Sequence, residues 1–96
     1  MIKHLVFFKF KSEASEADKQ AFKAMLDGLP AKIEVIKSYQ AGFDVIHSAR
    51  AFDVALIMDF ETLAALDVYA KHEHHLPVIE RSKGFCEQVA SVDFEY

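Results

Sequence analysis

The sequence predicts an α+β domain whose four strands and two helices follow the order β-α-β-β-α-β, with both helices on one face of the sheet. Three observations predict this fold. Residues 1–11 and 52–60 have the two-residue periodicity of β-strands. Residues 16–29 have the helical periodicity instead, with apolar side chains three and four positions apart. The 96 residues contain only three glycines and two prolines and no linker, so we expect one domain spanning residues 1–96.

The first strand, residues 1–11, has two different faces. Leu5 and Phe7 lie on one face, among lysines. The other face is apolar except for one histidine, and its members are Ile2, His4, Val6, Phe8 and Phe10. A histidine in such a row is either a core residue with a hydrogen-bond partner or a group that contacts a ligand, since imidazole titrates near pH ~6.5.

The first helix begins after Ser15, because Ser15 and Asp18 have the spacing of a capping box. Its apolar stripe recurs at the helical period and consists of Phe22, Met25, Leu26 and Leu29. Gly28 and Pro30 are expected to end the helix near residue 29. Residues 31–35 are compatible with a short further turn of helix.

The two central strands are expected at residues 36–45 and 52–60, with a loop at residues 46–51. In the first of these, one face holds Tyr39, Ala41 and Phe43. In the second, one face holds Phe52, Val54, Leu56, Met58 and Phe60, and the other holds Asp53, Ala55, Ile57 and Asp59. The centre of this last strand is apolar on both faces, which indicates a strand that is covered on both sides.

The C-terminal third is expected to hold a helix at residues 62–71, a short helix and a final strand. The first of these helices has Leu63, Leu66 and Ala70 on one side, with Tyr69 beside them. Residues 72–82 read as a helix broken near Pro77 and stopped by Gly84, with Val78 and Ile79 turned inward. In the final strand, residues 88–96, the apolar set Ala90, Val92, Phe94 and Tyr96 alternates with Ser91, Asp93 and Glu95.

Right-handed connections between these elements give a ferredoxin-like sheet with one bare face. Four apolar side chains lie on that face, namely Leu5, Phe7, Ala55 and Ile57. At ~25 cal/mol per Å² of apolar area, leaving them in water gives up several kcal/mol, which is comparable with the stability of a small domain. We therefore expect a homodimer in which two sheets pack face to face into an α+β barrel.

Charge and hydropathy exclude several classes of function. The formal net charge is −4 and no basic stripe is present, so no nucleic-acid partner is expected. The longest apolar runs, residues 5–8 and 54–58, are far shorter than the ~20 residues of a spanning helix or the core of a signal peptide. No membrane partner and a cytoplasmic location are the resulting expectations. The single cysteine, Cys86, excludes an internal disulfide and is expected to be a buried structural thiol.

A histidine cluster precedes Pro77. His72 and His75 have the i, i+3 spacing of two metal ligands on one helix face, and Glu73 or His4 could add a third. An HExxH motif is absent, and histidines at a helix end also interact favourably with the helix dipole. We therefore predict no metal site and no cofactor.

Tyr69 and His75 are the second candidate pair. Six residues separate them, so on one continuous helix they would lie about 240° apart. They can meet only if the helix is interrupted between them. His75 could then remove a proton next to a carbonyl group while the Tyr69 hydroxyl stabilises the developing oxyanion. The alternative is that Tyr69 is a rim residue with its ring buried and its hydroxyl in water.

Several segments carry a family resemblance that runs nearly from end to end. They are Ile2–Val6 with Phe8–Lys11, Ile36–Ser38 with Gly42 and Asp44–Val45, Phe52–Leu56, Tyr69-x-x-His72-x-x-His75, and Val92–Tyr96. In these segments the chain resembles the stress-responsive A/B-barrel (Dabb) family of small dimeric α+β barrels. The resemblance implies one Dabb-like domain over residues 1–96 that forms a homodimer.

The resemblance also implies site residues. The family includes a cofactor-free polyketide cyclase, whose proposed catalytic tyrosine and histidine match Tyr69 and His75 and whose first-strand pocket histidine matches His4. Two further polar pocket residues of that cyclase fall on Leu26 and Val54. Some members bind a cation through backbone carbonyls, which here would belong to Pro30, Ile33 and Ile36.

Three functions follow as hypotheses. The first is a dimer that binds a small hydrophobic or carbonyl-bearing ligand and acts as a cofactor-free cyclase, isomerase or lyase, with His4, Tyr69 and His75 as catalytic groups. The alternative is a non-enzymatic stress-response protein that acts as a stable dimer or larger assembly, which the apolar residues Leu26 and Val54 favour. Haem binding or cofactor-independent oxygenation rests on fold analogy alone.

Overall fold

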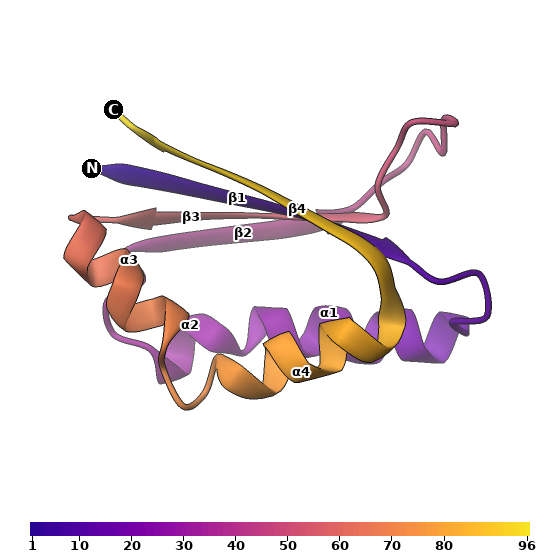
Figure 1. The fold of residues 1–96 in the computed structure, drawn as a ribbon, viewed down its shortest axis with the longest axis horizontal. Helices are drawn as coiled ribbons and strands as arrows, with labels where there is room; N and C mark the ends of the chain where they lie inside the picture. The colour runs from indigo at the N-terminus through magenta and orange to yellow at the C-terminus, as the bar shows by residue number, and fades with distance from the viewer.

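Four strands form one antiparallel sheet in the order β2-β3-β1-β4, with every helix on the same side of it (Figure 1). The computed structural model describes residues 1–96. The strands are β1 (Ile2–Phe10), β2 (Ser38–Phe43), β3 (Val54–Phe60) and β4 (Cys86–Glu95). The helices are α1 (Glu16–Asp27), α2 (Leu29–Lys32), α3 (Leu63–Ala70) and α4 (Leu76–Phe85). The predicted ferredoxin-like fold is thereby confirmed, and none of the helices has the length and apolar character that crossing a membrane requires.

The core lies between the sheet and the helices. The alternation in β1 and β3 sends Val6, Phe8, Leu56 and Met58 to this side, where all four are buried. Phe22 of α1 is completely buried, and its ring meets those of Phe8 and Phe10 at centroid distances of 5.1 and 5.8 Å. Edge-to-face contacts of this kind add to the free energy gained by burying the rings.

Helix α1 begins where the sequence predicts. The Ser15 side chain accepts the Asp18 N–H, and the Asp18 carboxylate accepts the Ser15 N–H, so both halves of the capping box are present. The helix ends at Asp27, and Pro30 lies in the first turn of the short α2, where a missing N–H costs nothing.

The region after α3 differs from the prediction in two ways. The helical structure is interrupted at residues 71–75, before Pro77 and not at it. Pro77 itself lies in the first turn of α4, where proline is well tolerated. Gly84 does not stop α4. It has no positive φ, and the helix continues to Phe85 before the chain passes directly into β4.

Two side chains face differently from expectation. Leu63 is 65% exposed, and Tyr69 is the one buried residue of α3. Phe52 does not continue the core row of β3, because β3 begins only at Val54. The Phe52 ring instead lies beside Phe7, 6.2 Å between centroids.

The opposite face of the sheet is bare. Helices cover only one side, and the loop between β2 and β3 projects on the other (Figure 1). The register of β1 with β4 pairs Leu5 with Val92 and Lys3 with Phe94. The apolar residues of β4 therefore lie on the bare face, where Phe94 is 47% exposed.

Candidate functional site

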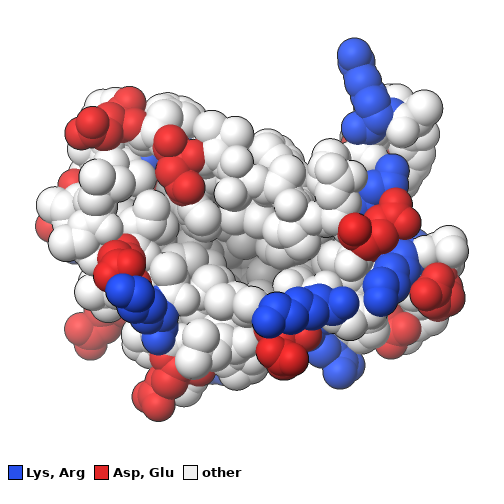
Figure 2. Space-filling view, viewed as in Figure 1, with Lys and Arg blue, Asp and Glu red and all other residues white.

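A pocket of about 410 Å³ opens between the sheet and the helices. It brings together the three side chains that the sequence singles out, His4, Tyr69 and His75. Most of the remaining lining is apolar and consists of Val6, Phe8, Leu26, Leu56, Val78, Ile79 and Val89. Figure 2 shows a hollow on this side of the molecule, walled by uncharged side chains, with charged ones around its rim.

The interruption between α3 and α4 brings Tyr69 and His75 together. Tyr69 belongs to the last turn of α3, and His75 is the residue that precedes α4. Their rings are stacked with centroids 4.2 Å apart. The His4 ring, on β1, approaches the Tyr69 ring edge-on at 5.7 Å. The convergence that requires a broken helix is therefore present.

His75 is arranged as a neutral proton acceptor. Its Nδ1 lies 3.1 Å from the carbonyl oxygen of Ala70, which can only accept, so Nδ1 carries the hydrogen and Nε2 is free of one in the neutral ring. The pKa of His75 is lowered, first because burial disfavours the charged ring, and also because His4 and His72 lie near. A neutral imidazole with an open Nε2 can act as a general base.

Tyr69 is arranged as a hydrogen-bond donor. Its side chain is only 2% exposed, and burial raises the pKa of its hydroxyl well above the usual range, so the group stays protonated. No hydrogen bond within the chain engages this hydroxyl. Because no completely enclosed side-chain polar atom lacks a partner, the hydroxyl keeps some exposed surface, and Tyr69 is one of the residues that line the pocket.

Asp93 is a polar group of this site that sequence reasoning missed. Antiparallel pairing of β1 with β4 places it opposite His4, and its carboxylate is hydrogen-bonded to His4 Nδ1. The alternating pattern of residues 88–96 is visible in the sequence, but the register with β1 is not. Pairing the two chain ends, Ile2 with Glu95, is the step that would have found it.

The two positions at which the resemblance implies missing polar groups have different surroundings. Leu26 is completely buried and lines the pocket, so the wall is apolar there. Val54 does not line this pocket. Ser82, Lys83 and Ser91 are further polar lining residues that the sequence did not single out.

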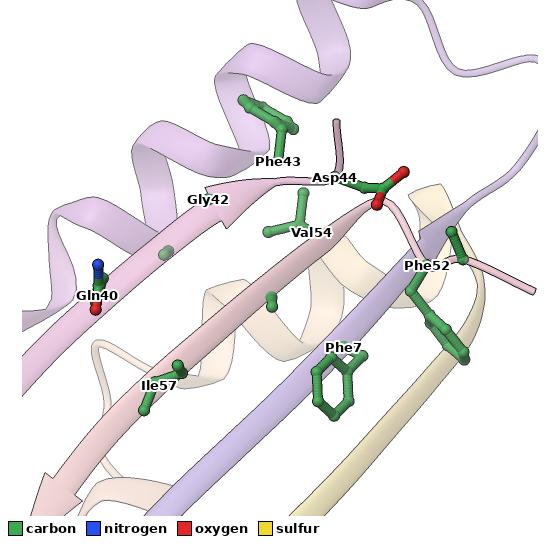
Figure 3. Close-up of a pocket in the computed structure, with 11 residues that line it drawn as sticks. Phe7, Gln40, Gly42, Phe43, Asp44, Phe52, Val54 and Ile57 are labelled. Carbon is green, nitrogen blue, oxygen red and sulfur yellow. The ribbon is translucent and has the colours of Figure 1, made fainter. Parts of the chain in front are cut away.

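A second hollow, of about 490 Å³, lies on the bare side of the sheet. Figure 3 shows Phe7 and Phe52 side by side in it, with Ile57 on the neighbouring strand β3. Phe43 points the other way, toward α1. The lining of this second hollow contains one charged residue, Asp44, whose carboxylate accepts the His47 backbone N–H at 2.6 Å.

The histidines of residues 72–75 face in different directions. No group of three or more His, Cys, Asp or Glu side chains converges on one point. The rings of His72 and His74 stack on each other at 5.4 Å, whereas His75 faces Tyr69. Cys86 is buried as expected, and burial raises the pKa of its thiol to about 11, so it is no nucleophile at neutral pH.

A ferredoxin-like sheet with helices on one face and a small pocket between the layers defines a class of small α+β proteins. Within that class, the chain belongs to the stress-responsive A/B-barrel (Dabb) family, because the family model described as "Stress responsive A/B Barrel Domain" matches residues 2–96.

Solved structures share this fold. A dimeric ferredoxin-like protein of unknown function from Bacteroides fragilis is 29% identical, with a TM-score of 0.84 over 99% of this chain and 95% of that one. A Dabb family protein from Mesorhizobium loti is 20% identical, with a TM-score of 0.83 over 99% and 95%. A hydroxynitrile lyase from Passiflora edulis is 20% identical, with a TM-score of 0.87 over 97% and 90%. The last two show the fold alone, and no curated protein matches the chain.

Proposed function

We propose that the pocket between the sheet and the helices binds a small hydrophobic, carbonyl-bearing ligand and catalyses a cofactor-free cyclase, isomerase or lyase step on it. The observation that carries this proposal is the convergence of His4, Tyr69 and His75 in a pocket whose lining is mostly apolar. The unit that acts is one domain, residues 1–96, as a homodimer. That a hydroxynitrile lyase has the same fold is compatible with lyase chemistry on this scaffold.

The chemistry is a proton transfer. His75 Nε2 takes a proton from the carbon next to the ligand's carbonyl group, the C–H bond breaks, and the electron pair moves onto the carbonyl oxygen. The Tyr69 hydroxyl donates a hydrogen bond to that oxygen as its negative charge develops. General-base catalysis of this kind contributes about 10²–10⁴-fold. The low pKa of His75 keeps the base unprotonated at neutral pH.

The test is hydrogen–deuterium exchange next to the carbonyl group of simple aryl ketones and 1,3-diketones in D2O, followed by NMR. We expect the protein to accelerate exchange of at least one probe, and His75→Ala to slow it by about 100-fold. Tyr69→Phe should slow it by about tenfold or more, since one donor to the oxyanion is lost.

Two matched variants serve as controls for this test. His74→Ala removes a neighbouring histidine that does not line the pocket. Tyr39→Phe removes a hydroxyl that is bonded to Asp27 at 2.7 Å, outside the pocket. Neither should alter exchange. Equal rates in His75→Ala, Tyr69→Phe and the unaltered protein would remove both residues from the site.

The homodimer is supported by the bare face of the sheet. Apolar side chains of three strands meet there, and they are Leu5, Phe7, Ala55, Ile57, Ala90, Val92 and Phe94. Fully burying a large apolar side chain contributes about 1.5–3 kcal/mol. A dimer that covers this face with a second copy gains that free energy for several side chains, and a lone chain does not. Several similar structures are described as dimeric. Sedimentation should give the mass of two chains, and a stable lone chain at micromolar concentration would contradict the proposal.

A non-enzymatic role as a stable stress-response assembly is the second candidate. Leu26 favours it, because an apolar side chain forms the pocket wall at a position where the resemblance implies a polar residue. In that case the dimer forms, but none of the ketone probes exchanges faster with the protein than without it.

A further inference from the structure

We propose that Asp93 is a positioning residue that fixes the tautomer of His4, so that His4 Nε2 accepts a hydrogen bond, and then the proton, from a hydroxyl group of the ligand. This inference rests on the proposed function of the pocket and extends it, because it assigns a separate task to each histidine and adds a hydroxyl group to the expected ligand. Asp93 itself does not line the pocket and acts through His4.

The sheet itself sets the geometry of the pair. His4 and Asp93 are directly opposite each other in the β1–β4 ladder, so both side chains stand on the helix-covered side. The His4 side chain is 13% exposed and that of Asp93 is 38% exposed. The histidine therefore lies inside the pocket, with the carboxylate behind it toward solvent. On its other side, the His4 ring meets the edges of Tyr69 and Phe60 at 5.7 and 6.1 Å.

The hydrogen-bond partner fixes where the His4 proton lies. An ionised carboxylate can only accept, so the contact between Asp93 and His4 Nδ1 requires the hydrogen on Nδ1. The neutral ring then carries a lone pair on Nε2, which no group of the chain engages. Because His4 lines the pocket, this lone pair can accept from a donor on the ligand. Among the common substituents of a carbonyl compound, a hydroxyl group supplies that donor.

Asp93 has no other evident task. Its carboxylate pairs with no lysine or arginine, and His4 is its one ionic partner. It does not cap a helix, and it lies near the C-terminal end of the edge strand β4, where a short polar side chain suffices. A carboxylate that engages only the Nδ1 of a pocket histidine is the arrangement that orients an imidazole for proton transfer.

The two histidines of the pocket differ in what holds their Nδ1. In His75 the acceptor is the neutral carbonyl of Ala70, and in His4 it is a carboxylate. When His4 takes a proton at Nε2, the hydroxyl O–H bond of the ligand breaks, its electron pair stays on the oxygen, and the imidazolium charge lies beside the negative Asp93. His75 lacks such a counter-charge, and its place beside Tyr69 assigns it to the carbon next to the carbonyl group that the Tyr69 hydroxyl engages.

The decisive experiment is ¹⁵N NMR of the histidine rings in the full-length protein at about pH 8.5, above the ordinary titration range of imidazole. We expect His4 to be the Nδ1–H tautomer in the unaltered protein. In Asp93→Asn the amide can donate to Nδ1, and His4 should become the Nε2–H tautomer that free imidazole prefers. Asp93→Glu, which keeps the carboxylate, should restore Nδ1–H. Asp67→Asn, at an exposed carboxylate that pairs with Lys71, is the matched control and should change nothing.

A ligand comparison tests the hydroxyl group. 2-Hydroxyacetophenone should bind about tenfold more tightly than 2-methoxyacetophenone, which cannot donate, and Asp93→Asn should reduce that preference to about twofold or less. Asp67→Asn should keep it. Tighter or equal binding of the methoxy compound to the unaltered protein would overturn the assignment of a hydroxyl group.

The two proposals fail separately. If His4 is the Nε2–H tautomer in the unaltered protein, or keeps Nδ1–H in Asp93→Asn, the role of Asp93 is overturned whether or not the ketone probes exchange. If the tautomer switches as expected while no ketone binds or exchanges, the positioning role of Asp93 stands and the proposed function of the pocket is the part that fails.

Discussion

The two faces of the sheet have similar alternating apolar rows but give their polar groups different surroundings. On the helix-covered side, the polar side chains His4, Tyr69 and His75 line a pocket whose other walls are mostly apolar. On the bare face the middle is apolar, and polar side chains gather at one end, where Asp59 meets Lys3, Ser38 and Tyr96. An apolar centre with a polar rim is the arrangement of a protein interface, whereas polar groups enclosed by apolar walls are typical of a ligand site.

Electrostatics separates the faces in the same way. Hydrogen bonds from Ser38 and Tyr96, together with Lys3, hold the pKa of Asp59 at about 2, so this carboxylate is satisfied and charged. The shift at His75 has the opposite origin, since burial disfavours its charge. A carboxylate whose hydrogen bonds and ion pairs are all made within the chain stabilises the surface, but it has no free acceptor for a ligand. The partly unpaired groups of the pocket keep donors and acceptors free.

The largest expected effect tests the claim that the chain's own helices complete the covered face. Phe22→Ala removes a ring with no exposed surface that packs between Phe8 and Phe10, and it should lower the free energy of unfolding by about 3–5 kcal/mol. Urea unfolding at two protein concentrations measures this. The concentration dependence expected of a dimer should persist, because the bare face is unchanged.

The control for this prediction is Val68→Ala on the exposed side of α3, which should cost about 0.5 kcal/mol or less. A loss below about 1 kcal/mol in Phe22→Ala would show that the helices do not pack on the sheet as described.

The next effect concerns the bare face. Ile57→Asp places a carboxylate in the middle of the proposed interface, and burying it unpaired should weaken the dimer by about 100-fold or more, roughly 3 kcal/mol. Sedimentation velocity across a dilution series measures the change. Leu63→Asp, which puts the same charge on an exposed position of α3, should leave the dimer intact. Dimers of equal strength in both variants would place the interface elsewhere.

The features that could be predicted from the sequence are local ones. Alternation fixed the faces of β1 and β3, and the Ser15–Asp18 pair located the start of α1, because each depends on neighbouring residues only. The predictions based on Gly84 and Pro77 were wrong, because a glycine can lie within a helix and a proline can lie in its first turn. In both cases the effect of the residue on the helix depends on the structure of the segment that follows it.

The candidate site was predictable to the same extent. His4, Tyr69 and His75 stood out as polar residues in apolar surroundings, and the structure places all three in one pocket. Asp93 did not stand out, because an aspartate that alternates with apolar residues in a terminal strand is ordinary. Its importance comes from the β1–β4 register, a contact between residues 89 positions apart. Contacts of that range are settled by the assembled sheet and not by any local pattern.

The smallest expected effect is a pH dependence that belongs to the pocket. The folded pKa of His75 lies below its unfolded value of about 6.5, chiefly through burial. Above pH ~6.5 the ring is neutral in both states and contributes nothing. As the pH falls below that value, the unfolded chain binds a proton that the folded chain refuses, so stability is lost until the folded pKa is passed. Partial exposure of the ring keeps the effect small through solvent screening.

His75→Gln should remove this part of the pH dependence, because glutamine does not titrate and its amide can still donate to the Ala70 carbonyl. Unfolding in urea at about pH 7.5 and pH 5.5 should therefore show a smaller loss of stability in the variant than in the unaltered protein. His47→Gln, in the exposed loop on the bare side, should lose as much as the unaltered protein does. If His75→Gln and His47→Gln behave alike, the pocket does not disfavour the charged imidazole. The two faces of the sheet would then differ in shape but not in the electrostatic environment they give a histidine.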